Sequence, residues 1–222
     1  MKKLCVVSCP IATRSGYGSR SRDLVRSLIE TKGEEWDIKI LPQRWGNTPQ
    51  NALTSEDTDL TSRMITGQMN QKPDIWMQIT IPSEFQPVGH FNIGVSAVIE
   101  TTEASPDFIE GCNRMDLTIV SSEHSKVTLN AVYDKLDEKT KQKLGEVKLT
   151  KPVEVLFEGF DPNIYDNKKE VHTSVNDALS DVKESFAYLF VGHWLQGNIG
   201  HDRKNVSGLI HTFLNTFKNK KN

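Results

Sequence analysis

Two cations near the end of the chain fall where a helix is expected to begin. Arg203 and Lys204 lie in the expected first turn of a helix whose apolar stripe recurs over residues 206–217, and Asp202 could cap it. Because the backbone dipole is positive at a helix N-terminus, cations there lower stability unless an anion lies between them. Free amides and two cations together therefore predict a phosphate site. The alternative is a pair of solvated side chains on a surface helix, where charges contribute little to stability.

A second group of cations follows the first apolar segment. Gly16 and Gly18 form a G-x-G pattern that lets the backbone approach a ligand closely, and Arg14, Arg20 and Arg22 surround it. The same reasoning predicts an anion at this loop. The pattern lacks the third glycine of a dinucleotide fingerprint and the lysine that ends a P-loop. A tight turn between a strand and a helix is the alternative explanation.

Polar residues also follow two later apolar segments. Glu100 and Thr101 come after residues 93–99, and the Glu100 carboxylate could hold sugar hydroxyls, act as a base, or simply cap a helix. Ser121 follows residues 117–120, where capping of the next helix is the simpler interpretation and contact with a ligand hydroxyl is the other.

No metal site is expected. Asp57 and Asp59 form a D-x-D pattern, which in one class of sugar transferase holds a divalent metal and a nucleotide diphosphate, but here the pair does not close an apolar strand. The six histidines show no paired ligand spacing. Three cysteines, an odd number, fit a reducing cytosol, and we expect all of them to be buried. A cytoplasmic location is therefore expected.

Alternating strands and helices must position these residues. The expected strands are 4–8, 36–41, 74–79, 93–99, 117–121, 153–157 and 186–192, and the expected helices include 105–115, 123–133 and 206–217. Residues 134–151 are dense in Lys and Glu and are expected to form a solvated helix and loop. The order predicts an α/β fold, a Rossmann-like parallel sheet with helices on both faces. In such sheets ligands bind outside the carboxyl ends of the strands, where Gly16, Glu100 and Ser121 fall.

Length and charge set limits on organisation and function. The 222 residues suffice for one full domain and part of another. We expect an N-terminal Rossmann-like domain over 1–166, a linker over 167–185, and the first strand–helix unit of a second Rossmann-like domain over 186–222. The net charge of -2 gives no general attraction to nucleic acid or to an anionic membrane. No apolar run approaches the ~20 residues that span a bilayer.

Five segments, in order, resemble the GT-B glycosyltransferases, specifically the large retaining group that includes glycogen-synthase-like and mannosyltransferase-like enzymes. The segments are 15–18 with 22–24, 92–102, 115–122, 153–161, and 190–192 with 203–205. They extend over nearly the whole chain. The resemblance implies transfer of a sugar, with retention of configuration, from a nucleotide-sugar donor to an unknown acceptor, without a metal or other cofactor. It also implies that residues 186–222 are the incomplete start of the nucleotide-sugar-binding domain.

The resemblance also implies roles for particular residues. Lys204 would contact the donor diphosphate with help from Arg203, because charge that develops on the leaving diphosphate must be stabilised. Gly16 and Gly18 would approach the donor phosphates or the acceptor. The candidates for contact with the acceptor or the donor sugar are Ser15, Tyr17, Glu100, Thr101 and Ser121. Glu100, the candidate catalytic residue, stands where many relatives carry a histidine, and His193 replaces the family's arginine after the 186–192 segment.

The family's donor domain has several further strand–helix units beyond the point that corresponds to residue 222. We therefore expect a fragment, or one subunit of a split enzyme, with little or no activity until another chain supplies the rest of that domain. The alternative is a non-catalytic Rossmann module that binds a glycan or nucleotide and docks a catalytic partner. A nicotinamide-dependent dehydrogenase or epimerase is disfavoured, because the third glycine and a Tyr-x-x-x-Lys pair are lacking.

Overall fold

The computed structural model describes residues 2–137, 139–163, 165–192, 194, 198–202 and 204–220. The chain divides into two units, Met1–Asp161 (unit 1) and Pro162–Asn222 (unit 2). Among the described residues, no helix is long and apolar enough to cross a membrane.

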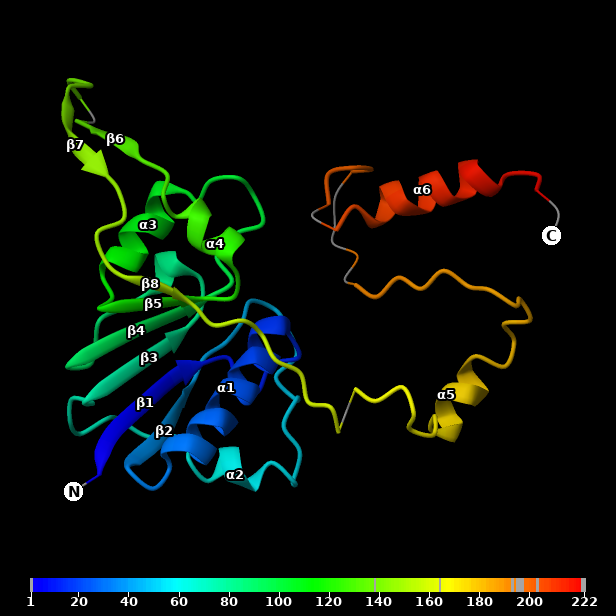
Figure 1. The fold of residues 1–222 in the computed structure, drawn as a ribbon, viewed down its shortest axis with the longest axis horizontal. Helices are drawn as coiled ribbons and strands as arrows, with labels where there is room; N and C mark the ends of the chain where they lie inside the picture. The colour runs from blue at the N-terminus through cyan, green and yellow to red at the C-terminus, as the bar shows by residue number, and fades with distance from the viewer. Residues whose placement is uncertain are drawn as a thin grey trace. The chain divides into compact units, whose positions relative to one another are not determined.

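A six-stranded sheet organises unit 1 (Figure 1). Its strands are β1 (Lys3–Cys9), β2 (Trp36–Pro42), β3 (Ile75–Ile79), β4 (Phe91–Ser96), β5 (Leu117–Val120) and β8 (Val153–Val155). Their order is β2-β1-β3-β4-β5-β8, and every neighbouring pair is parallel. The expected α/β fold with a Rossmann-like parallel sheet is confirmed.

Helices cover both faces of this sheet (Figure 1). They are α1 (Gly16–Lys32), α2 (Thr58–Thr61), α3 (Pro106–Asn113), α4 (Glu123–Thr128) and the short 3-10 helix η1 (Pro82–Glu84). Successive residues of a strand point to opposite faces. Accordingly, Val7 packs in a core that includes Val25 of α1, whereas Val6 packs in a core that includes Ile109 of α3.

The strand order places a topological switch point between the two neighbouring strands β1 and β3. β1 lies between β2 and β3, so the chain leaves β1 toward one side and returns on the other. Loops that diverge in this way leave a crevice at the carboxyl ends of the two central strands, which is where ligands bind in open α/β sheets. In unit 1 we therefore expect a crevice beyond the carboxyl ends of β1 and β3.

The segment expected to be a solvated helix and loop forms strands instead. β6 (Tyr133–Leu136) and β7 (Lys143–Val147) make an antiparallel hairpin, separate from the main sheet. Lys143 reaches Asp134 on the opposite strand at 2.6 Å, so opposite charges stabilise the pairing across the ladder. The preceding helix, expected to reach residue 133, ends at Thr128, because Tyr133 joins β6 and donates its hydroxyl to the Ala104 carbonyl at 2.8 Å.

The three cysteines are buried, as expected. Burial raises the pKa of the Cys5 and Cys9 thiols to about 12 and that of the Cys112 thiol to about 11. A thiol with so high a pKa carries almost no thiolate and is a poor nucleophile or metal ligand. The cysteines therefore serve as small packing residues.

Unit 2 contains two helices, α5 (Thr173–Ala178) and α6 (Val206–Phe217). The apolar stripe predicted over 206–217 is confirmed as a helix, and α5 lies within the segment expected to be a linker. The strand expected over 186–192 is wrong: these residues form no strand, and Leu189 is 88% exposed. A strand needs a neighbour to pair its backbone, and the described part of unit 2 contains no other strand. The Tyr188 ring contacts Phe213 of α6 instead, with the ring centroids 5.8 Å apart.

Candidate functional site

The loop between β1 and α1 is held by its own polar side chains. The Ser15 hydroxyl accepts from the Gly18 N–H at 3.0 Å and lies 2.8 Å from the Thr13 hydroxyl, so Ser15 is the N-cap of α1. A Cβ at position 18 would lie 2.2 Å from the Thr13 carbonyl oxygen, whereas a Cβ at Gly16 would meet nothing within 4 Å. Close packing therefore requires Gly18, and Gly16 leaves open space beside the first turn.

The three arginines around this loop are hydrogen-bonded within the chain. Each donates to a backbone or amide oxygen. The partners are Ile11 and Thr13 for Arg22, Asn51 for Arg14, and Leu156 for Arg20. Burial also lowers the pKa of Arg22. The sequence predicted that these arginines surround a bound anion. In the structure, their hydrogen bonds connect the loop to neighbouring segments.

Tyr17 connects this loop to β4. Its hydroxyl lies 3.0 Å from the Ser96 hydroxyl at the carboxyl end of β4 and accepts from the Ala97 N–H at 3.1 Å. Burial raises the pKa of Tyr17, the bonds to Ser96 and Ala97 oppose the shift, and the charges of Glu100 and Glu158 add to it. The Tyr17 hydroxyl therefore stays protonated and fixes the first turn of α1 against the end of β4.

The backbone beside this contact is unusual. Val98 has a φ of 62°, a conformation that β-branched residues rarely adopt, and its N–H donates to the Ser96 hydroxyl at 3.0 Å. β4 therefore ends at Ser96, three residues before the expected end, and the chain turns away from the sheet. Such strained residues concentrate at functional sites, which directs attention to this edge of the sheet.

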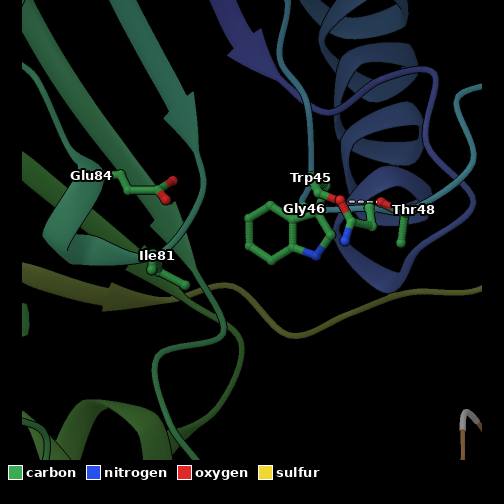
Figure 2. A pocket seen from close by; sticks show the side chains of 6 residues that line it. Trp45, Gly46, Thr48, Ile81 and Glu84 are labelled. Carbon is green, nitrogen blue, oxygen red and sulfur yellow. Dashed lines mark hydrogen bonds between the residues drawn. The ribbon is translucent and has the colours of Figure 1, made fainter. Parts of the chain in front are cut away.

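A cavity of about 370 Å³ lies beside Tyr17. It is lined by Trp45, Gly46, Asn47, Thr48, Ile81 and Glu84 (Figure 2). The indole of Trp45 stacks on the Tyr17 ring, with centroids 4.1 Å apart and planes inclined by 28°. Thr48 donates its hydroxyl to the Trp45 carbonyl and so closes the turn that carries the indole. Figure 2 shows Ile81 and Glu84 on the other side of the cavity from Trp45.

The remaining candidates of unit 1 lie near this edge but are not all brought together. Glu100 is exposed and lies close enough to Tyr17 for its charge to act on the tyrosine. Thr101 is exposed, and its hydroxyl donates to the Glu103 carbonyl at 3.0 Å. Ser121 is half-buried directly after β5, while Ser122 caps α4 by accepting from the Ser125 N–H.

Sequence reasoning missed Trp45, Glu84 and Ser96. Trp45 lies between the expected strands 36–41 and 74–79, where a lone aromatic residue was the available signal. Ser96 lay inside an expected strand, and Glu84 follows β3 without any motif. These residues become candidates because Trp45 and Ser96 contact Tyr17 and because Trp45 and Glu84 line the cavity.

The helix near the end of the chain begins later than expected. α6 starts at Val206 after the N-cap Asn205, which has a φ of 48°, so Lys204 lies before the helix and not in its first turn. The Asp202 carboxylate accepts from the Val206 N–H at 3.1 Å and from the Ser207 hydroxyl at 3.0 Å. An anion of the chain itself therefore lies at the positive end of the helix dipole. Lys204 is exposed, and Arg203 and His193, for which the sequence predicted roles, lie outside the described residues.

The D-x-D pair is engaged by an arginine. Arg26 of α1 reaches Asp57 at 2.6 Å and Asp59 at 3.0 Å. The pKa of Asp57 is lowered by the N–H of Thr54 and by the Arg26 guanidinium. The two carboxylates thus join α1 to the start of α2, and their arrangement is explained without a metal ion.

Comparison with known proteins gives no match: neither a protein-family model nor a curated protein sequence matches this chain. Inference about its function therefore depends on the geometry of unit 1 and on the resemblance of the five segments.

Proposed function

We propose that this chain acts as the acceptor-side part of a retaining GT-B glycosyltransferase, which transfers a sugar from a nucleotide-sugar donor to an unidentified acceptor without a metal ion. The ordered resemblance of five segments motivates this function. The parallel α/β sheet of unit 1, with its crevice beyond β1 and β3, supports it.

Two separated segments of that resemblance meet in the structure, and this contact carries the proposal. Tyr17 belongs to the segment 15–18, and Ser96 and Ala97 belong to the segment 92–102. The Tyr17 hydroxyl lies 3.0 Å from the Ser96 hydroxyl and 3.1 Å from the Ala97 nitrogen. Ser96 is the last residue of β4 and Tyr17 lies in the helix that follows β1, so the contact supports one shared site at the carboxyl ends of parallel strands in place of two unrelated turns.

The proposed chemistry divides between the two units. In unit 1, the candidate contacts to the acceptor or sugar are Ser15, Tyr17, Glu100, Thr101 and Ser121. Of the two glycines proposed to approach phosphate or acceptor, only Gly16 is exposed, since Gly18 is buried and its N–H is bonded to Ser15. Glu100 is the candidate base for the acceptor hydroxyl. In unit 2, Lys204, with Arg203, would stabilise the negative charge that develops on the departing nucleoside diphosphate.

Binding by the full chain tests this function first. We would titrate the purified protein, in EDTA, with UDP-, GDP- and ADP-sugars and with a panel of oligosaccharides, and follow the backbone amide resonances of Ser15, Ser96 and Ala97. Saturable shifts at these amides with a nucleotide sugar or a glycan are expected. If no ligand of either class moves them, the proposed site is wrong.

A non-catalytic glycan- or nucleotide-binding module is the second candidate, because Arg14, Arg20 and Arg22 are used within the fold. The two candidates differ when the donor domain of a retaining GT-B enzyme is added to the chain. A glycosyltransferase subunit should then release nucleoside diphosphate from a nucleotide sugar in a reaction that depends on the acceptor. A binding module should hold its ligand and release none.

A further inference from the structure

The Trp45 indole has two different faces. One is covered by the stacked ring of Tyr17, 4.1 Å away between centroids, and the indole also lines the cavity of about 370 Å³ that it shares with Glu84. Two bonds to the Trp45 carbonyl, from the N–H of Thr48 at 3.1 Å and from its hydroxyl, hold the turn that presents the ring (Figure 2). An aromatic ring that is held by stacking and that also borders a cavity offers a contact surface for a ligand.

Across the cavity from the indole lies a carboxylate without a cationic partner. Glu84 accepts a hydrogen bond from the hydroxyl of Thr80, a neutral group. No lysine, arginine or histidine of the described residues forms an ion pair with Glu84. The cavity therefore places an aromatic ring opposite a negative charge that the described chain does not neutralise.

Other carboxylates make the surroundings of the stack more negative. Burial is the first cause of the raised pKa of Tyr17, but the charges of Glu100 and Glu158 raise it further. Arg20, which lies 3.8 Å from Glu158, also donates to the Leu156 carbonyl at 2.8 Å. A phosphate or another anion would be repelled from this cavity, whereas a cation would be attracted to both the carboxylates and the ring face.

We infer that the cavity between Trp45 and Glu84 binds an organic ammonium group. The cation would lie against the Trp45 indole, by a cation–π interaction, and opposite the Glu84 carboxylate, by charge attraction. The cavity volume falls within the range of small-molecule sites. This inference is independent of the proposed glycosyltransferase activity, since it needs only contacts within unit 1.

A pair of probes with nearly the same shape tests the charge directly. The full chain would be titrated with choline and, separately, with 3,3-dimethyl-1-butanol, which replaces the ammonium nitrogen by carbon. The readout is the indole N–H resonance of Trp45 in a proton–nitrogen correlation spectrum, assigned by its loss in Trp45→Phe. We expect choline to bind at least about tenfold more tightly than the neutral alcohol.

Two substitutions separate the proposed role of Glu84 from a general charge effect. Glu84→Gln keeps an oxygen that accepts from Thr80 but removes the charge, and it should reduce the preference for choline severalfold, leaving only the part that the Trp45 ring supplies. Glu30→Gln removes an exposed carboxylate of α1 and should leave the preference intact. Equal binding of both probes, binding of neither, or a preference that is undiminished in Glu84→Gln each overturns the inference. Thermal unfolding of each variant checks that loss of binding does not reflect loss of the fold.

Discussion

The hydroxyl of Tyr17 lies 3.0 Å from the hydroxyl of Ser96, which is 79 residues further along the chain. The contact joins the first turn of α1 to the carboxyl end of β4, and a face of the same tyrosine ring stacks on Trp45. Tyr17 therefore links three segments at the carboxyl ends of the strands, where a ligand is expected. The shape of the candidate site depends on this tyrosine.

Tyr17→Phe should weaken the site more than the fold. The substitution keeps the ring stacked on Trp45 but removes the hydroxyl bonded to Ser96 and Ala97, so we expect a loss of about 1 kcal/mol in the free energy of unfolding. The amide resonance of Ala97 should shift in the free protein. Denaturation in urea measures the stability. Tyr165→Phe, at a tyrosine that is 71% exposed, is the control and should change stability by less than about 0.5 kcal/mol. Equal effects of the two substitutions would contradict this role.

Gly111→Ala should destabilise unit 1, although alanine is the better helix former. Helix propensity alone predicts a gain of up to about 1 kcal/mol in α3. However, a Cβ at Gly111 would lie 1.9 Å from the carbonyl oxygen of Pro82 in η1. Backbone atoms must move to relieve that contact, so we expect a net loss of about 1–3 kcal/mol, measured by urea denaturation. Because η1 also carries Glu84, ligand binding in the cavity should weaken as well.

Gly145→Ala is the matched control for that substitution, because a Cβ at Gly145 meets nothing within 4 Å. It lies in the hairpin, away from η1, and should leave binding in the cavity unchanged. A Gly111→Ala protein as stable as the wild type would show that α3 and η1 separate more easily than their packing indicates.

The stability contributed by Asp116 should disappear in acid. Its carboxylate accepts from the side chain of Asn92 at 3.0 Å and from the Asn92 N–H at 2.8 Å, and these bonds lower the pKa of Asp116 below its ordinary value of 3.8. A lowered pKa in the folded state stabilises the protein above the unfolded-state pKa, and this contribution is lost as the pH falls through the folded-state pKa. The destabilisation caused by Asp116→Asn, at most about 1 kcal/mol after solvent screening, should therefore shrink below about pH 4.

Urea denaturation of wild type and Asp116→Asn between about pH 6 and pH 3 measures that difference. Asp23→Asn, at an exposed carboxylate of α1, is the control and should show no such acid-dependent convergence. If the stability difference between wild type and Asp116→Asn stays constant through the acid range, the bonds to Asn92 are not its cause.

Lys204→Ala tests the proposed donor contact. If Lys204 binds the diphosphate, its removal should weaken the binding of UDP, GDP or ADP at least about tenfold, since a charge-assisted hydrogen bond is worth roughly 1.5–3 kcal/mol. Isothermal titration calorimetry in EDTA measures the affinity. Lys218→Ala removes an exposed lysine just after α6 and is the matched control. Equal losses in the two variants would point to non-specific attraction, and no loss in Lys204→Ala would exclude the contact.

Apolar periodicity in the sequence determined most of the sheet and the principal helices. The buried strand residues Val6 and Val7, the stripe around Val25 and the stripe over 206–217 repeat at short intervals, and such repeats depend only on neighbouring residues. The start of α3 was equally readable, because Pro106 favours the first position of a helix. These features gave the α/β fold class without any knowledge of distant contacts.

Tertiary contacts decided what local patterns left open. The Lys- and Glu-rich stretch formed a hairpin in which Lys143 meets Asp134 across the ladder. The apolar residues 186–192 formed no strand, because no strand in the described part of unit 2 pairs with them. The partners of Arg20 and Arg22, the stacking of Tyr17 on Trp45 and the position of Glu84 across the cavity all join residues from different segments. The sequence places the crevice at the strand ends, and only the packing of those ends determines which side chains line it.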